Sequence, residues 1–172
     1  MDAYSMLLTR RACRAYKPDP VPEELLEKVL VAGSFAPSAM GRQPCKILAV
    51  TDKALRDELM KDNAAILGNP DSDPFYGAPV VLVVLADASL PTRVYDGSLV
   101  MGNLLNAAHA VGLAGCWIHR ARETFEMPRW KAFLTEQGIE GNWEGIGNCI
   151  LGFSARPLPA PSPRKAGMIC RF

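Results

Sequence analysis

Residues 78–87, APVVLVVLAD, form one of the longest apolar runs of the chain and decide its fold class. β-Branched and apolar side chains follow one another there without polar alternation, between Pro79 and Asp87. Such a run is typical of a strand that is buried on both faces of its sheet. We therefore expect a buried strand here, and its neighbours along the chain indicate what covers it.

Three further short apolar segments predict strands, and periodic segments around them predict helices. The predicted strands are residues 45–52, 114–118 and 145–152. The predicted helices are residues 3–9 with Asp2 as N-cap, 22–33, 52–62 with Asp52 as N-cap, 93–111 and 128–137. Helices come first and then alternate with strands, which predicts an α/β or α+β fold with at least four strands.

Two segments have more apolar surface than their own fold is expected to cover. The helix over 93–111 is apolar around much of its circumference, so it is either buried centrally or pressed against a second subunit. The tail over 156–172 is too rich in proline to begin as a helix, yet it ends in Met168, Ile169 and Phe172. Our hypothesis is that this tail packs on a partner.

Composition excludes several classes of protein. At 172 residues the chain is expected to form one domain, 1–172, with 157–172 as an extended tail. Nineteen basic and eighteen acidic side chains leave no overall field for nucleic acid or a membrane surface. We find no leader sequence and no membrane-length apolar run, so we expect a cytoplasmic protein. Five scattered cysteines without a C-x-x-C pair indicate packed, reduced thiols rather than disulfides or zinc.

The familiar catalytic motifs are missing. There is no G-x-S-x-G elbow, Walker loop or H-E-x-x-H helix. The glycines of residues 145–152 have the wrong spacing for a dinucleotide loop, and they lie in a predicted strand instead of after one. Cys116 and His119 are three residues apart near a strand end and point in different directions, which disfavours a Cys–His nucleophile. His109 is expected to be a packing or interface residue.

Arginines cluster near the N-terminus, where residues 7–16 read LLTRRACRAY. Arg10, Arg11 and Arg14 fall within five positions, and a second basic pair, Arg164 and Lys165, lies near the C-terminus. Guanidinium groups form bidentate, charge-assisted hydrogen bonds to phosphate. From the residues alone, a solvated surface and a site for a phosphate-bearing ligand both remain open.

The order of several segments resembles a known family over essentially the whole chain. Residues 7–44 carry an R-R-x-x-R element, a PVPEE helix start and an A-P-S-x-x-x-x-Q-P loop. Residues 73–87, 96–126 and 151–165 continue the pattern. Together they resemble the FMN-dependent nitroreductase family, in particular its short, single-domain members.

The resemblance implies an α+β fold with a mixed β-sheet flanked by helices, in an intertwined homodimer whose C-terminal tails are exchanged between subunits. One FMN would lie in each of two sites at the dimer interface. The basic element would hold its phosphate and ribityl chain, the A-P-S loop would reach it from the other subunit, and the strand end would run beside the ring. The residues that match these cofactor contacts are Arg10, Arg11, Ala12, Arg14, Pro37, Ser38, Ala39, Gly41, Ile118, His119, Arg120, Arg164 and Lys165.

The activity implied is hydride transfer by a ping-pong mechanism. NADH or NADPH would reduce FMN and leave, and a nitroaromatic, quinone or similar small acceptor would then be reduced. His119 is the candidate catalytic residue, as a proton donor to the acceptor; alternatively only its backbone meets the flavin. A specialised flavoenzyme of the same fold (dehalogenation, flavin fragmentation or heterocycle oxidation) and a flavin-binding or redox-sensing protein without turnover are the alternative functions.

The sequence also departs from the family pattern. Ala12 stands where a serine hydroxyl is usual, Gly41 where asparagine is common, and Cys45 where tryptophan is common. The first two changes remove polar contacts to the cofactor region. Cys45 is either a repacked position or an active-site thiol. Asn63 or Asn69 is expected to meet the polar edge of the flavin.

Overall fold

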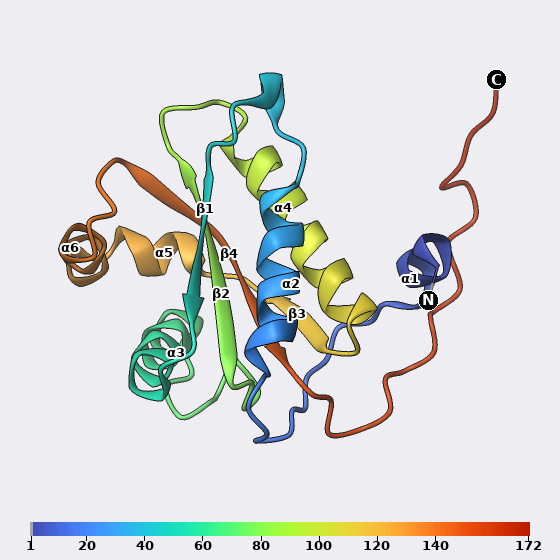
Figure 1. Cartoon of the computed structure of the whole chain (residues 1–172), viewed down its shortest axis with the longest axis horizontal. Coiled ribbons are helices and arrows are strands. Elements are labelled where there is room, and N and C mark those ends of the chain that lie inside the picture. The colour runs from blue at the N-terminus through green and yellow to red at the C-terminus, as the bar shows by residue number, and fades with distance from the viewer. Residues whose placement is uncertain (1) are drawn as a thin grey trace.

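The computed structural model describes residues 2–172, and its core is a four-stranded antiparallel sheet with helices on both faces (Figure 1). Its strand order is β1-β2-β4-β3. The strands are β1 (Cys45–Val50), β2 (Val80–Asp87), β3 (Ala114–Ile118) and β4 (Trp143–Gly152). The helices are α1 (Ala3–Thr9), α2 (Glu23–Ser34), α3 (Lys53–Leu67), α4 (Arg93–Ala110), α5 (Ala121–Glu126) and α6 (Pro128–Glu136), with a 3₁₀ turn over Ala39–Gly41.

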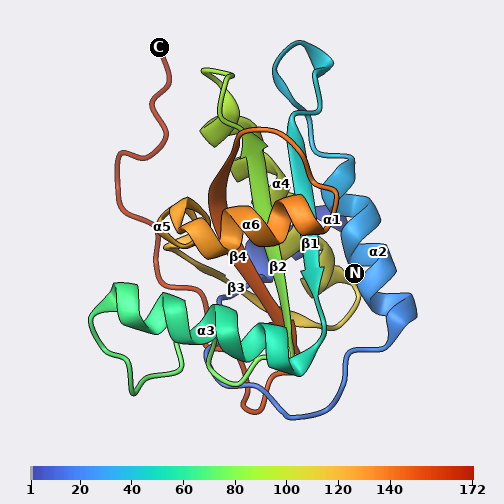
Figure 2. The ribbon, with the colours of Figure 1, turned by 90° about the vertical axis from the view of Figure 1, so that its left-hand side faces the viewer.

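Strand β2 lies inside the sheet, as its apolar run predicts. Every residue from Val80 to Ala86 is buried, because β1 and β4 flank the strand and helices cover both faces. Helices α2 and α4 pack on one face, through residues such as Leu26 and Leu104. Helices α3, α5 and α6 cover the other, as Figure 2 shows. The α+β fold class is confirmed.

All four strands pair antiparallel, so the mixed character expected of the sheet is limited to one place. The segment before α2 reaches the free edge of β3, where Ala12 and Gly115 form a parallel bridge. A β-bulge interrupts the pairing of β2 with β4 between Val84 and Leu85, which pair with Gly147 and Gly145 respectively. The bulge brings Gly145 against the beginning of α5, a point that matters for the site.

Most predicted elements are confirmed, with small differences at their ends. Asp2 and Asp52 cap α1 and α3 by accepting the backbone N–H groups of Ser5 (3.0 Å) and Leu55 (2.8 Å). Helix α3 continues to Leu67, beyond the predicted end at residue 62. Helix α5 is not predicted, since it has only six residues and follows a residue with a left-handed backbone.

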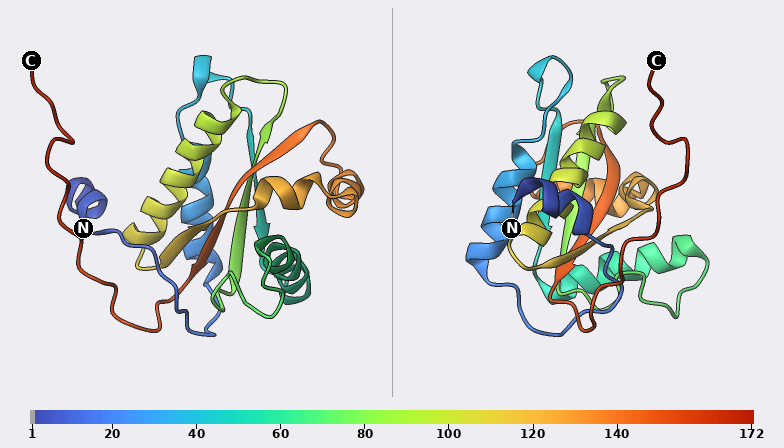
Figure 3. Two further views of the ribbon diagram at one scale, coloured as in Figure 1. Left: turned by 180° about the vertical axis from the view of Figure 1, so that it is seen from behind. Right: turned by 90° about the vertical axis from the view of Figure 1, so that its right-hand side faces the viewer.

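The outer surface of α4 and the C-terminal tail remain uncovered. Val94, Tyr95 and Leu99 of α4 are exposed, while Met101 and Leu104 on its inner side are fully buried. The tail runs out from the body of the subunit beyond α1 (Figure 3), and residues 159–172 are all exposed. None of the helices in residues 2–172 is long and apolar enough to cross a membrane.

Candidate functional site

The basic segment near the N-terminus lies along the edge of the sheet. Because β3 is an edge strand, its outer side is free to pair, and the Cys13 N–H donates to the Gly115 carbonyl at 3.1 Å. With the bridge from Ala12 to Gly115, this pairing fixes the backbone on which Arg10, Arg11 and Arg14 stand. The sequence-predicted basic element and the predicted strand over 114–118 are thus brought together.

The positive charge of this cluster is not compensated by the chain itself. No carboxylate of residues 2–172 lies within ion-pair distance of Arg10, Arg11 or Arg14. Arg11 donates to the Leu8 carbonyl at 2.9 Å and to the Arg10 carbonyl, but its buried Nε has no hydrogen-bond partner among the described residues. Three uncompensated guanidinium groups with one orphaned donor suit a phosphate.

His109, near the C-terminal end of α4, lies in the positive electrostatic field of the arginine cluster. Burial first, and the guanidinium groups of Arg10 and Arg11 second, lower the pKa of His109 below its usual range. Its Nε2 lies 2.9 Å from the Thr9 hydroxyl, so the imidazole joins α4 to α1. His109 is therefore a packing residue, as predicted, and it stands beside the basic cluster.

The far end of β3 is held by two buried asparagines from other elements. Asn63 of α3 and Asn148 of β4 both donate to the His119 carbonyl, at 3.0 and 3.2 Å. Beyond it, the Arg120 carbonyl accepts the Thr124 hydroxyl at 2.7 Å and the Thr124 N–H at 3.0 Å. These bonds hold Arg120 at φ 73°, in a left-handed backbone that non-glycine residues adopt rarely.

Asn63, not Asn69, therefore belongs to this region. Its side chain is buried, and its Oδ1 accepts the Nε of Arg120 at 3.0 Å. Asn69 lies in the loop after α3, where its carbonyl accepts the Ser72 hydroxyl at 2.7 Å. Sequence reasoning missed Asn148, although a lone amide within the apolar strand over 145–152 was a signal for a buried polar role.

The loop with residues 37–41 is built at the opposite end of α4. The buried Asp96 carboxylate accepts the Ala39 N–H and the Thr92 hydroxyl, both at 2.8 Å. The Ser38 hydroxyl accepts the Gln43 N–H at 2.9 Å. Gly41 stands at φ 65°, a left-handed backbone that glycine adopts without strain.

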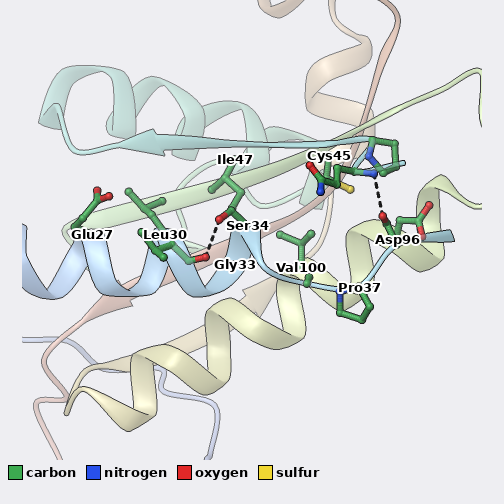
Figure 4. A pocket seen from close by; sticks show the side chains of 14 residues that line it. Glu27, Leu30, Gly33, Ser34, Pro37, Cys45, Ile47, Asp96 and Val100 are labelled. Atoms are coloured by element: carbon green, nitrogen blue, oxygen red, sulfur yellow. Dashed lines mark hydrogen bonds between the residues drawn. The ribbon is translucent and has the colours of Figure 1, made fainter. Parts of the chain in front are cut away.

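Within one chain, the loop of residues 37–41 lies far from the N-terminal arginine cluster. Asp96 and His109 are 13 positions apart in α4, which at a rise of 1.5 Å per residue places the loop and the basic cluster about 20 Å apart. A pocket of about 460 Å³ lies beside the loop, between α2, α4 and the start of β1 (Figure 4). It is lined by Pro37, Ser38, Cys45 and Asp96, among others, and by no arginine.

Cys45 in this pocket is not an activated thiol. Burial first, and the Asp96 carboxylate second, raise the pKa of the Cys45 thiol to about 11. A thiol with this pKa stays protonated at neutral pH and is a poor nucleophile. The repacked-position interpretation of Cys45 is therefore the one that the structure favours.

Comparisons with known proteins agree with this geometry. The sequence model of the Nitroreductase family matches residues 7–134. This chain belongs to the nitroreductase family. A curated relative from Methanothermobacter thermautotrophicus, provisionally named NADH dehydrogenase/NAD(P)H nitroreductase, is 33% identical over 95% of this chain and 80% of its own. The predicted family is confirmed.

Other nitroreductase-fold proteins show how far the family extends. A crystal structure of a nitroreductase with bound FMN from Bacteroides fragilis is 26% identical, with a TM-score of 0.89 over 100% of this chain and 99% of that one. A 5,6-dimethylbenzimidazole synthase from Rhodospirillum rubrum is 29% identical over 92% of this chain and 84% of its own. The fold is thus shared by proteins whose names describe different reactions.

The cofactor contacts expected of the tail and of the end of β3 stay predictions. Arg164 and Lys165 are exposed on the tail, and Arg164 donates to the Ser162 carbonyl at 2.7 Å from Nη2. No hydrogen bond or ion pair within residues 2–172 joins them to the N-terminal arginines. Ile118 is buried, whereas the His119 side chain is exposed beside Trp117, with ring centroids 6.1 Å apart.

Proposed function

We propose that this protein is an FMN-dependent NAD(P)H oxidoreductase that reduces a nitroaromatic, a quinone or a similar small acceptor by a ping-pong mechanism. The observation that carries the proposal is the uncompensated cluster of Arg10, Arg11 and Arg14 along the edge of β3. The FMN bound by the Bacteroides fragilis nitroreductase and the name of the Methanothermobacter relative support it. The proposed unit is one FMN-binding domain over 1–172.

The proposed site uses the two ends of β3 differently. Ala12 bridges to Gly115, and Ile118 lies three residues further along the strand, about 10 Å away at 3.3 Å per residue. That separation suits a ligand with a phosphate and a flat ring at the two ends of a ribityl chain. Arg10 and Arg11 would hold the phosphate, and the backbone of residues 118–120 would lie beside the ring.

The chain supplies orientation and charge, while FMN, when bound, carries the hydride between nicotinamide and acceptor. Arg14 would lie towards the ring and stabilise negative charge that develops there. Asn63 and Asn148 fix the backbone of His119 through its carbonyl, and the exposed imidazole would lie within reach of the acceptor. This assigns His119 the role of proton donor without a nucleophilic side chain.

The distance along α4 supports a shared site in a homodimer. The loop of residues 37–41 and the arginines lie about 20 Å apart in one chain, so a pocket that contains both needs a second subunit. Exposed Tyr4 and Leu7 of α1 and Leu99 of α4 offer apolar surface for that contact. We propose that the tail, with Arg164 and Lys165, is exchanged across it.

The proposed dimer predicts a definite sedimentation result. Because each site would draw residues from two chains, flavin-containing protein should sediment as a species of twice the 18.7 kDa chain mass. Removing the tail after Arg156 should weaken this assembly. Sedimentation velocity with detection at the flavin absorbance band tests both points, and a flavin-bound monomer would contradict the shared site.

The proposed activity predicts a yellow protein that NADH or NADPH bleaches without oxygen. The expected result is loss of the oxidised-flavin band on addition of either nicotinamide, followed by its return when a nitroaromatic or quinone is added. The measurement is an anaerobic absorbance titration with stopped-flow mixing. Protein that takes up no FMN would defeat the whole proposal.

A second candidate is a specialised flavoenzyme of the same fold, and the relation to the Rhodospirillum rubrum 5,6-dimethylbenzimidazole synthase is the observation in its favour. A flavin-binding or redox-sensing protein without turnover is the other alternative, supported by Ala12 and Gly41, which lack the polar side chains common at these positions. Flavin that dithionite reduces but neither nicotinamide reduces would favour these alternatives.

A further inference from the structure

We propose that Arg120 is a specificity residue that binds an oxyanion, a carboxylate or a phosphate, on the substrate that stacks against the flavin. This inference rests on the proposed function, because that function places the end of β3 beside the ring. It goes beyond the function by naming the chemical class of substrate. The family pattern does not supply it; the arrangement around Arg120 does.

The backbone of Arg120 is fixed on both sides. The carbonyl before it, of His119, accepts two buried amides, and its own carbonyl accepts both the hydroxyl and the N–H of Thr124. A left-handed backbone at a residue with a long side chain costs free energy. Such a conformation persists because these four hydrogen bonds determine it.

The side chain of Arg120 is also held at its base. Nε donates to the Oδ1 of Asn63 at 3.0 Å, and Asn63 is itself 1% exposed and anchored by its bond to His119. This bond uses one of the five N–H donors of the guanidinium group and orients its plane. The terminal nitrogens make no hydrogen bond within residues 2–172.

No acidic group of the described chain neutralises this guanidinium. Arg120 is in no ion pair, and two of the acids near it in sequence or on neighbouring helices have other partners. Glu123 of α5 is exposed and forms no ion pair with Arg120. Asp62, next to Asn63, accepts the side chains of Arg129 and Trp130, while Glu126 of α5 pairs with Arg122. The Arg120 guanidinium is thus partly buried, oriented and unpaired, and its two terminal nitrogens are available as donors. Such a group can bind an oxyanion through two parallel hydrogen bonds.

The phosphate of FMN is not the anion in question. The basic cluster proposed for that phosphate stands beside Gly115, about 10 Å along β3 from Ile118, and Arg120 lies two residues beyond Ile118. An oxyanion at Arg120 therefore belongs to a second molecule, either a carboxylate on the acceptor or the additional phosphate of NADPH. Both sources offer the same chemistry, and the experiment separates them.

The test compares isosteric ligands that differ in charge. In the wild-type holoprotein, benzoate should bind more tightly than benzamide, read from perturbation of the flavin absorbance without turnover. In turnover, the measured quantity is the ratio of kcat/KM for 4-nitrobenzoate to that for 4-nitrobenzamide. R120Q should lower this ratio at least about tenfold, because the charge-assisted bonds are lost, and R120K should restore part of it.

A second arm identifies the source of the anion, and a matched variant controls for charge. If R120Q lowers the ratio of kcat/KM for NADPH to that for NADH and leaves the nitrobenzoate ratio unchanged, the oxyanion is the phosphate of the reductant. R122Q removes the same charge two residues away, from an exposed arginine, and should change neither ratio.

Two results would overturn the inference. One is a change of less than about twofold in both ratios for R120Q; the other is an equal change in R122Q. Failure of the proposed function is distinct from these, since it appears in the wild type as flavin that NADH and NADPH do not bleach. Even then, ligand binding to the holoprotein tests Arg120 by itself: benzoate that binds no more tightly than benzamide, together with NADP⁺ that binds no more tightly than NAD⁺, would refute its role.

Discussion

Replacing Arg10 and Arg14 together with alanine is expected to give a folded but colourless protein. Both arginines stand beside the edge of β3 without an internal carboxylate partner, so their removal leaves no charge unpaired inside the fold. Arg10 would bind the phosphate and Arg14 would lie towards the ring of FMN. Each hydrogen bond from a charged group is worth about 1.5–3 kcal/mol, so losing both contacts should weaken FMN binding at least about a hundredfold. Flavin absorbance after gel filtration and the FMN dissociation constant measure this.

The control for that variant removes the same number of charges elsewhere. Lys17 and Arg122 are exposed, and the double substitution K17A/R122A should retain flavin. Raising the ionic strength should weaken FMN binding in the wild type and less so in R10A/R14A, because fewer charges then face the phosphate. Wild-type flavin content in R10A/R14A would remove these arginines from the site.

The sequence was sufficient for the sheet because the signals for its strands are local. The apolar run of β2 is contained in a single segment of the chain. The helix caps Asp2 and Asp52 are equally local, because each bonds to a residue three positions further along the chain. Helix α5 could not be predicted this way. Its six residues begin after the left-handed Arg120, whose conformation depends on amides from α3 and β4.

The site was predictable only in part for the same physical reason. The arginine cluster is contiguous and visible in the sequence, whereas the groups that hold its surroundings are distant. Asn63 meets His119 across 56 positions, and Asp96 meets Ala39 across 57. Pairings over such separations depend on the final packing. The sequence therefore shows the polar residues but does not show which groups they bond to.

The glycines of residues 145–152 illustrate the same limit. Their spacing rightly argued against a dinucleotide loop, but it did not show why glycine is needed. A side chain at Gly145 would place its Cβ 2.2 Å from the carbonyl oxygen of Ala121 and 2.8 Å from the backbone nitrogen of Arg122. Glycine is required because β4 and the start of α5 approach backbone to backbone.

Gly145→Ala is therefore expected to be among the most destabilising single-methyl additions in the chain. The clashing atoms are backbone, so β4 and α5 must separate, at a cost of about 3 kcal/mol or more. For a chain of 172 residues this corresponds to a fall in Tm of about 10 °C. The separation would also disturb the bonds from Thr124 to Arg120, so flavin binding should weaken with stability.

Gly33→Ala is the matched control, because its added Cβ would also meet an atom at 2.4 Å. That atom is the Cδ2 of Leu104, the end of a side chain that can change rotamer, and alanine also favours the helix α2. Its cost should be less than half that of Gly145→Ala. Urea midpoints at fixed protein and FMN concentration measure both, since bound ligand shifts apparent stability. Equal losses in the two variants would show that backbone contact is not what requires glycine at position 145.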